Sequence, residues 1–197
     1  MAIAAVFLDK DGTLVDDVPY NVDPARITLA RNAVASLSQL RDAGFAFIVV
    51  SNQPGVAQGR FTLEALDDVE ARLHKLFDQN DLSLLSCCWC PHDPHGVVDP
   101  FARACGCRKP APGLIVDAAR RHGVDVSQSW MIGDILDDVE AGRRAGCRTV
   151  LLDNGHETLW QWAPLRTPHV IARTLIDAAA QIVAHTRRAA THAELLP

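Results

Sequence analysis

The chain has 197 residues, of which 48% are hydrophobic and 22% are charged. This length and composition are typical of one globular domain and exclude the fibrous and disordered classes. The formal net charge of -5 disfavours nucleic acid as a partner, because phosphate backbones are bound by clustered Lys and Arg. We expect a single domain over residues 1–186 and a C-terminal tail over residues 187–197.

The first apolar run, residues 3–8, is too short to span a membrane or to form the core of a signal peptide, and no basic region precedes it. We therefore expect a cytoplasmic protein that does not bind membranes. In a reducing compartment, the six cysteines are better suited to metal binding or catalysis than to structural disulfides.

Short, β-branched apolar runs bounded by polar turns alternate along the chain with segments of helical spacing. This alternation predicts an α/β fold, a Rossmann-like parallel sheet with helices on both faces, whose ligands lie outside the carboxyl ends of the strands. Two proline-containing loops, 16–27 and 90–112, interrupt it on the side where a substrate would bind. The predicted strands are 3–8, 45–50, 82–89, 130–132 and 149–152, and the predicted helices are 30–43, 62–79, 112–122, 136–145 and 173–186.

Two carboxylates, Asp9 and Asp11, directly follow the first predicted strand, in the sequence Asp-Lys-Asp-Gly-Thr. Asp and Gly are also common in surface turns, so the spacing alone is weak evidence. After a buried strand, however, one carboxylate can attack phosphorus while the other protonates the leaving oxygen and later activates water. Two acids in one pocket repel each other, so we expect a divalent cation beside them.

Ser51, Asn52 and Gln53 follow the second predicted strand, where a hydroxyl and main-chain N–H groups can bind phosphoryl oxygens. Lys109, in the long second loop, supplies the positive charge that a phosphoryl group requires. Taken alone, the first segment is an ordinary loop start and an isolated Lys is usually solvated. A phosphate-binding role for these residues therefore depends on which residues follow the other predicted strands.

Asp134 follows the fourth predicted strand, and Asp138 lies four residues further along the chain. One of these acids could cap the following helix. Asp134 is nearer the strand and is better placed to bind Mg²⁺, with Asp138 supporting it or the start of the helix.

In this order, and at these strand ends, the motifs resemble those of the haloacid dehalogenase superfamily of phosphatases. The resemblance implies a Mg²⁺-dependent phosphoric monoester hydrolase with an aspartyl-phosphate intermediate. It implies that Asp9 is the nucleophile, that Asp11 is the general acid and base, and that Ser51 and Lys109 stabilise the transferring phosphoryl group. It also implies that Asp9, Asp11 and Asp134 hold the Mg²⁺ ion.

A second candidate metal site lies in the long loop, where Cys90 and His92 are followed by Cys105 and Cys107. Three thiolates and an imidazole make a closed tetrahedral zinc site, which is structural because no position remains for water. The alternatives are buried free thiols or a disulfide between Cys90 and Cys105 in an oxidising setting.

A zinc ion would stabilise the loop, about residues 88–109, which has no core of its own and which delivers Arg108 and Lys109 to the pocket. The three other cysteines lie in or beside apolar runs and are interpreted as packing residues. They are Cys87, Cys88 and Cys147.

The zinc loop resembles that of the branch of the superfamily that holds heptose bisphosphate phosphatases and histidinol phosphatases. Residues 51–59 and 108–113 look closer to the heptose enzymes, which implies hydrolysis of the 7-phosphate of D-glycero-D-manno-heptose 1,7-bisphosphate. In that family, the counterpart of Arg108 helps to recognise the second phosphate. One departure is Ile135, at a position where heptose phosphatases usually carry Lys. The other implied substrate contacts are Val18, Pro19, Tyr20, Asn21, Asn52 and Gln53.

Two alternative functions are weighed against this one. The first is histidinol-phosphate hydrolysis, which uses the same core and zinc loop. The second is a non-catalytic phosphate-binding or docking module, although both candidate catalytic acids are present. A phosphomutase fits less well, because no segment after Asp11 is long enough for a separate cap domain. We expect a monomer, and the alternative is association through a patch around Trp160 and Trp162.

Overall fold

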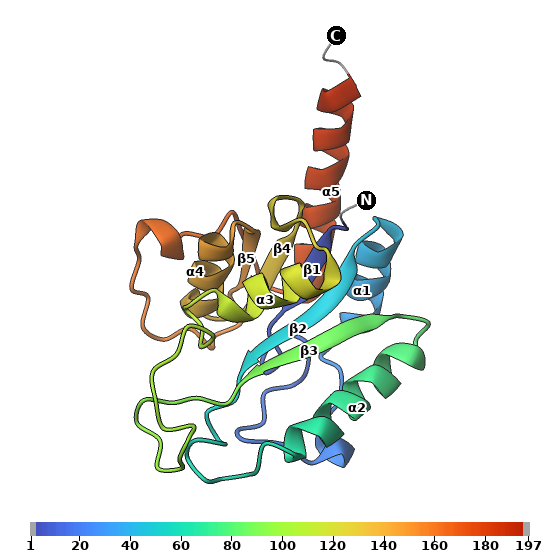
Figure 1. Ribbon diagram of the computed structural model, residues 1–197. Helices are drawn as coiled ribbons and strands as arrows, with labels where there is room; N and C mark the ends of the chain where they lie inside the picture. The colour runs from blue at the N-terminus through green and yellow to red at the C-terminus, as the bar shows by residue number, and fades with distance from the viewer. Residues whose placement is uncertain (1–2, 195–197) are drawn as a thin grey trace.

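Among residues 3–194, which the computed structural model describes, six parallel strands form one sheet in the order β3-β2-β1-β4-β5-β6 (Figure 1). Five of them correspond to the predicted strands. The strands are β1 (Ala5–Leu8), β2 (Ala46–Asn52), β3 (Leu84–Cys90), β4 (Trp130–Gly133), β5 (Arg148–Leu152) and β6 (Val170–Ala172).

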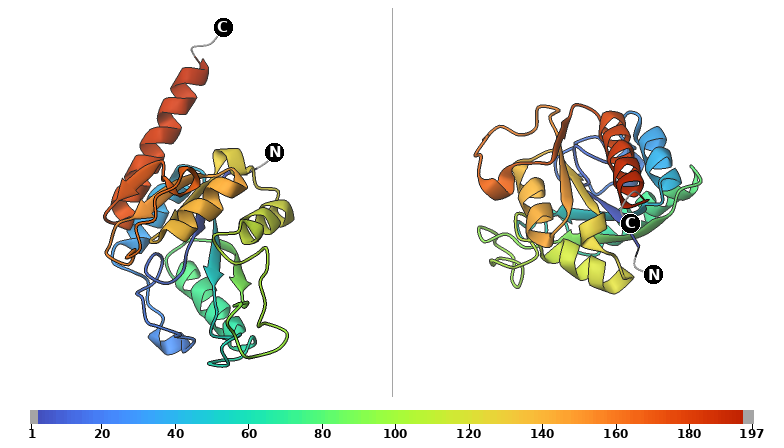
Figure 2. Two further views of the ribbon diagram at one scale, coloured as in Figure 1. Left: turned by 90° about the vertical axis from the view of Figure 1, so that its left-hand side faces the viewer. Right: turned by 90° about the horizontal axis from the view of Figure 1, so that it is seen from above.

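Helices cover both faces of this sheet (Figure 2). Successive strand residues point to opposite faces, so Val6 and Leu8 of β1 pack toward α1, α2 and α5, whereas Ala5 and Phe7 pack toward α3 and α4. The helices are α1 (Ala33–Asp42), α2 (Ala65–Asp78), α3 (Gly113–His122), α4 (Leu136–Ala145) and α5 (Leu175–Glu194), and the short 3-10 turns are η1 (Pro24–Arg26), η2 (Val126–Gln128) and η3 (Pro164–Arg166).

The strand order reverses beside β1, because the chain runs outward to β3 and then returns to place β4 on the other side of β1. Leu8 of β1 pairs with Ile132 of β4, and the Asp9 N–H donates to the Ile132 carbonyl at 2.9 Å. The residues that follow β1 and β4 therefore emerge side by side. In an open parallel sheet, this reversal is where ligands bind.

The predicted fold class, a parallel sheet with helices on both faces, is confirmed, whereas one strand was missed and the last helix was predicted to end too early. Strand β6 was missed, because three residues after Pro168 give no periodic signal. Helix α5 was predicted to end at residue 186 and continues to Glu194, since Ala and Arg in that stretch favour helix. In Figures 1 and 2, α5 extends beyond the rest of the domain.

Of the predicted tail, residues 187–194 form the end of α5, and residues 195–197 lie outside the described part of the chain. Within the described part, no helix is both long enough and apolar enough to span a membrane.

Candidate active site

Lys109 is buried at the centre of the site and contacts three elements of the fold. Its Nζ lies 2.5 Å from Asp9 Oδ1 and 2.5 Å from Asp138 Oδ1, and it donates to the Val50 carbonyl at 3.0 Å. Burial opposes its charge, but Asp138 and Asp9 outweigh that effect and raise the pKa of Lys109 above its ordinary value. The site therefore contains a fixed positive charge next to the Asp9 carboxylate.

Asn52, at the end of β2, positions the main chain of Lys109. The Lys109 N–H donates to Asn52 Oδ1 at 2.9 Å, and Asn52 Nδ2 donates to the Lys109 carbonyl at 3.0 Å. Both ends of the Asn52 amide are thus used to hold the lysine. Direct contact between Asn52 and a substrate stays a prediction.

Gln53 joins the two other candidate catalytic groups. Its Nε2 donates to Asp11 Oδ2 at 3.2 Å and to Ser51 Oγ at 3.1 Å, while Lys10 Nζ lies 2.5 Å from Asp11 Oδ1. Burial raises the pKa of Asp11 in spite of the opposing charge of Lys10. A raised pKa suits a carboxyl group that must donate a proton.

Asp9, Asp134 and Asp138 form a buried group of carboxylates, in which one oxygen of each lies within 4.8 Å of the others. Among the described residues, Lys109 supplies the one Lys or Arg charge that pairs with this group, and it contacts Asp9 and Asp138. Burial, and next the charge of Asp9, raise the pKa of Asp134 to about 6. This excess of negative charge on hard oxygen donors fits a divalent cation such as Mg²⁺.

The third member of that group differs from the predicted set of Mg²⁺ ligands. The Asp11 carboxylate is held by Lys10 and Gln53, whereas Asp138 lies with Asp9 and Asp134. Asp138 is fully buried and pairs with Lys109. A role for Asp11 in binding the cation stays a prediction.

Asp138 also holds the start of α4. This agrees with one alternative from the sequence, in which one of the two acids caps the following helix. Its Oδ2 accepts a hydrogen bond from the Ile135 N–H at 3.3 Å. Gly133 makes room for the carboxylate, because a Cβ at that position would collide with the Asp138 side chain. The same residue thus orients both the lysine and the helix.

The predicted substrate contacts lie in the loops near this edge of the sheet. Arg108 Nη1 donates to the His92 carbonyl at 3.3 Å, and the guanidinium of Arg60 lies 4.0 Å from the ring centroid of Tyr20. Asn21 donates to the Arg26 carbonyl at 3.3 Å within its own loop. These contacts hold the loops together, and the substrate roles of Val18, Pro19, Tyr20, Asn21, Gln53 and Arg108 stay predictions.

The segment that follows β5 also reaches the site, although none of its residues was predicted from the sequence. His156 Nδ1 lies 2.5 Å from Asp134 Oδ2, and Asn154 Nδ2 donates to the Gly12 carbonyl at 2.7 Å. Both side chains line a cavity of about 340 Å³ that shares Gly12 and Thr13 with the site. The available signal was their position directly after a predicted strand, the criterion that had identified Asp9.

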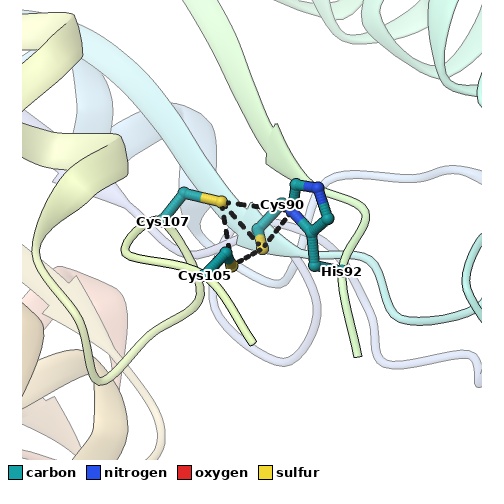
Figure 3. Close-up of side chains that lie close together, drawn as sticks. All are labelled: Cys90, His92, Cys105 and Cys107. Atoms are coloured by element: carbon teal, nitrogen blue, oxygen red, sulfur yellow. Dashed lines mark hydrogen bonds between the residues drawn. The ribbon is translucent and has the colours of Figure 1, made fainter. Parts of the chain in front are cut away.

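The four predicted zinc ligands converge where β3 ends: Cys90 is the last residue of β3, and the other three lie in the long loop that follows (Figure 3). Cys107 Sγ lies 3.2 Å from Cys90 Sγ, 3.2 Å from Cys105 Sγ and 3.4 Å from His92 Nδ1. Cys90 Sγ lies 3.6 Å from Cys105 Sγ and 3.7 Å from His92 Nδ1. Ligands about 2.0–2.3 Å from a tetrahedral zinc ion lie about 3.3–3.8 Å apart, so this cluster could hold one.

The protonation states of the imidazole and the three thiols in the cluster are affected differently by their surroundings. Burial, and next the charge of Arg103, lower the pKa of His92 and favour the neutral imidazole that binds metals. Burial raises the pKa of Cys90 and Cys107, whereas hydrogen bonds from Cys107 and the Arg108 N–H outweigh burial and lower that of Cys105. A bound cation would be needed to ionise all three thiols.

The sequence and the fold are similar to those of known phosphatases. Residues 106–178 match the HAD-hydrolase-like family model. A D-glycero-beta-D-manno-heptose-1,7-bisphosphate 7-phosphatase from Escherichia coli K12 is 33% identical over 151 residues, covering 77% of this chain and 79% of the relative. A D-glycero-alpha-D-manno-heptose-1,7-bisphosphate 7-phosphatase from Photorhabdus laumondii is 31% identical over 157 residues, covering 79% of this chain and 86% of the relative.

Two solved structures agree with these relatives. A HAD-like phosphatase from Mesorhizobium loti superposes with a TM-score of 0.80 at 30% identity and covers 95% of this chain and 87% of its own. A D,D-heptose 1,7-bisphosphate phosphatase from B. bronchiseptica, complexed with magnesium and phosphate, gives a TM-score of 0.77 at 29% identity. The match covers 93% of this chain and 99% of the B. bronchiseptica chain. The chain belongs to the HAD-like phosphoric monoester hydrolases, in the family of the heptose-1,7-bisphosphate 7-phosphatases.

The raised pKa of Asp134 predicts how a bound Mg²⁺ ion would stabilise the protein at different pH values. In the metal-free state, a raised pKa contributes stability below about pH 4 that is lost as the pH rises through about 6. A Mg²⁺ ion at Asp134 would require the ionised carboxylate, so the increase in melting temperature that Mg²⁺ produces should be larger at about pH 7.5 than at about pH 5. Thermal unfolding with and without Mg²⁺ measures this difference. An equal shift at both pH values, or a wild-type shift in Asp134→Asn, would contradict it.

Proposed function

We propose that this protein hydrolyses the 7-phosphate of D-glycero-D-manno-heptose 1,7-bisphosphate, through an aspartyl-phosphate on Asp9. The observation that carries the chemistry is the buried contact of Asp9 with Lys109 at the carboxyl end of β1. The names of the relatives, two of which act on the beta and alpha forms of this sugar, support the substrate.

In the first half of the reaction, a carboxylate oxygen of Asp9 attacks phosphorus while Asp11 gives a proton to the departing sugar oxygen. Lys109 and the Ser51 hydroxyl bind the phosphoryl oxygens. In the second half, Asp11 takes a proton from water, which attacks the same phosphorus, releases phosphate and restores Asp9. A Mg²⁺ ion held by Asp9 and Asp134, with Asp11, would neutralise charge on the transferring group.

Arg108 is our candidate for recognising the second phosphate, because it lies beside Lys109 and its planar guanidinium can make two hydrogen bonds to a phosphate. Ile135, at the start of α4, adds no cation. The remaining contacts come from Gln53 and from the loop that contains Tyr20. The partner is thus a small phosphorylated sugar.

A substrate panel with Mg²⁺ tests this assignment. Phosphate release should be fastest from one of the heptose 1,7-bisphosphate anomers, compared with histidinol phosphate and fructose 1,6-bisphosphate. Asp9→Asn should lower kcat by about 1,000-fold or more, because no other group replaces the nucleophile. Asp42→Asn, the same change at a carboxylate whose side chain is 68% exposed on α1, is the control. Preferred hydrolysis of histidinol phosphate would overturn the substrate, and an active Asp9→Asn would overturn the mechanism.

We also propose that Cys90, His92, Cys105 and Cys107 bind a structural zinc ion. The separations of their ligand atoms support this, and no ligand position is left for water. The role of the ion is to fix the loop, which reaches Lys109 two residues after Cys107.

Removal of the zinc ion should therefore make the loop that carries Lys109 more mobile. The purified protein should contain about one equivalent of zinc, and Cys107→Ser should lower zinc content, melting temperature and phosphatase activity together. Cys147→Ala, a change at a buried cysteine outside the cluster, should keep its zinc. Elemental analysis measures the zinc content, and thermal unfolding measures the melting temperature. A folded, active wild type without zinc would refute the assignment.

We further propose a cytoplasmic monomer that binds neither nucleic acid nor membranes. The six cysteines form no disulfide, and a cluster of free thiols is compatible with a reducing compartment. Trp160 and Trp162 are 41% and 53% exposed, with ring centroids 5.5 Å apart, and form the surface through which association would occur if the monomer prediction is wrong.

A further inference from the structure

The segment that follows β5 carries side chains that no part of the mechanism above uses. We propose that His156 is a positioning residue for the metal site: it fixes the Asp134 carboxylate in the orientation that binds Mg²⁺, and Asn154 and Glu157 hold His156 in place. The inference rests on the proposed function, because it assigns a role toward the cation of that site.

The Asp134 carboxylate is held from two sides. Its Oδ2 lies 2.5 Å from His156 Nδ1, and its Oδ1 accepts a hydrogen bond from the Thr13 hydroxyl at 3.4 Å. Asp134 is only 5% exposed, so water has little part in fixing it. Each carboxylate oxygen has two lone pairs, and either oxygen can still bind a cation while it keeps its present partner. Hydrogen bonds of this kind orient metal-binding carboxylates in many proteins.

Two further contacts fix the segment that bears His156. Asn154 Nδ2 donates to the Gly12 carbonyl at 2.7 Å, in the turn that follows Asp9. Glu157 Oε2 accepts a hydrogen bond from the Leu136 N–H at 2.7 Å, at the first residue of α4. Three contacts within four residues thus join the loops that follow β1, β4 and β5. In the sheet, β5 is next to β4 and β4 is next to β1, so the segment after β5 lies beside the loop after β4 and extends to the loop after β1.

Gly12 shows how closely these groups pack. Its φ of +74° lies in the left-handed region, and a Cβ there would collide with both the Asp134 carboxylate and the His156 ring. The histidine therefore reaches Asp134 only across a residue without a side chain. A solvated surface ion pair would not need this close approach.

The hydrogen bond has a predictable effect on metal binding. Without the Nδ1 donor, Asp134 Oδ2 loses a partner and the carboxylate can rotate, so that part of the binding free energy is spent on ordering it. The His156 side chain is 38% exposed, so its truncation removes little from the hydrophobic core. The expected result is weaker Mg²⁺ binding in a protein that remains folded.

Three variants test this role. His156→Ala removes the donor, whereas His156→Asn keeps an N–H near the position of Nδ1 and adds no charge. His74→Ala is the matched control, because His74 on α2 is also 38% exposed and lies 3.7 Å from Glu70. For each variant we would titrate Mg²⁺ against the melting temperature of the substrate-free protein and against phosphate release.

His156→Ala should raise the half-saturating Mg²⁺ concentration by about 10- to 100-fold in both titrations, with most of kcat recovered at saturating Mg²⁺. His156→Asn should restore most of the affinity, and His74→Ala should match the wild type. Unchanged Mg²⁺ affinity in His156→Ala, while the wild type binds Mg²⁺, would overturn this inference alone. If His156→Asn bound Mg²⁺ as weakly as His156→Ala does, the charge of His156 and not its hydrogen bond would account for the effect, and the positioning role would be wrong. A wild type that bound no Mg²⁺ would overturn the inference together with the proposed function.

Discussion

The buried ammonium of Lys109, paired with Asp9 and Asp138, is the interaction on which the rest of the site depends. A lysine removed from water costs several kcal/mol unless it is paired and hydrogen-bonded, and here two carboxylates and the Val50 carbonyl supply those partners. The three partners come from the ends of β1 and β2 and from α4. The lysine can therefore be accommodated only when the sheet and the first turn of α4 are in place.

This requirement explains why a long loop is fixed so firmly. Lys109 lies in a segment without a core of its own, and a flexible chain would place its charge poorly. Asn52 binds both main-chain groups of the lysine, and the cysteine and histidine cluster closes the loop two residues earlier. On the other side of Asp9, the segment after β5 binds Gly12 and Asp134. The Asp9 carboxylate thus lies between the Lys109 ammonium and two fixed loops, and the excess of negative charge at the site fits a cation.

Much of this arrangement could be predicted from the sequence, because strand ends in a parallel sheet converge on one edge. That rule located Asp9, Ser51 and Asp134, and cysteine spacing located the second cluster. What could not be predicted was which side chains pair with each other. Motif order cannot show that Gln53 would bind Asp11, or that Asp138 rather than Asp11 would complete the carboxylate group, since both depend on side-chain direction in three dimensions. His156 was missed because an Asn-Gly-His-Glu segment resembles an ordinary turn until its neighbours are known.

The central claim is that Asp9 itself carries the phosphoryl group. The most direct test uses Asp11→Asn, which lacks the base for the second step, with an aryl phosphate whose leaving group needs no proton. After rapid quenching, borohydride reduces an aspartyl-phosphate to an alcohol, and mass spectrometry of the peptide locates the modified residue. The account predicts conversion of Asp9 to homoserine. Turnover of the aryl phosphate with an unmodified Asp9, or with the modification at another residue, would contradict it.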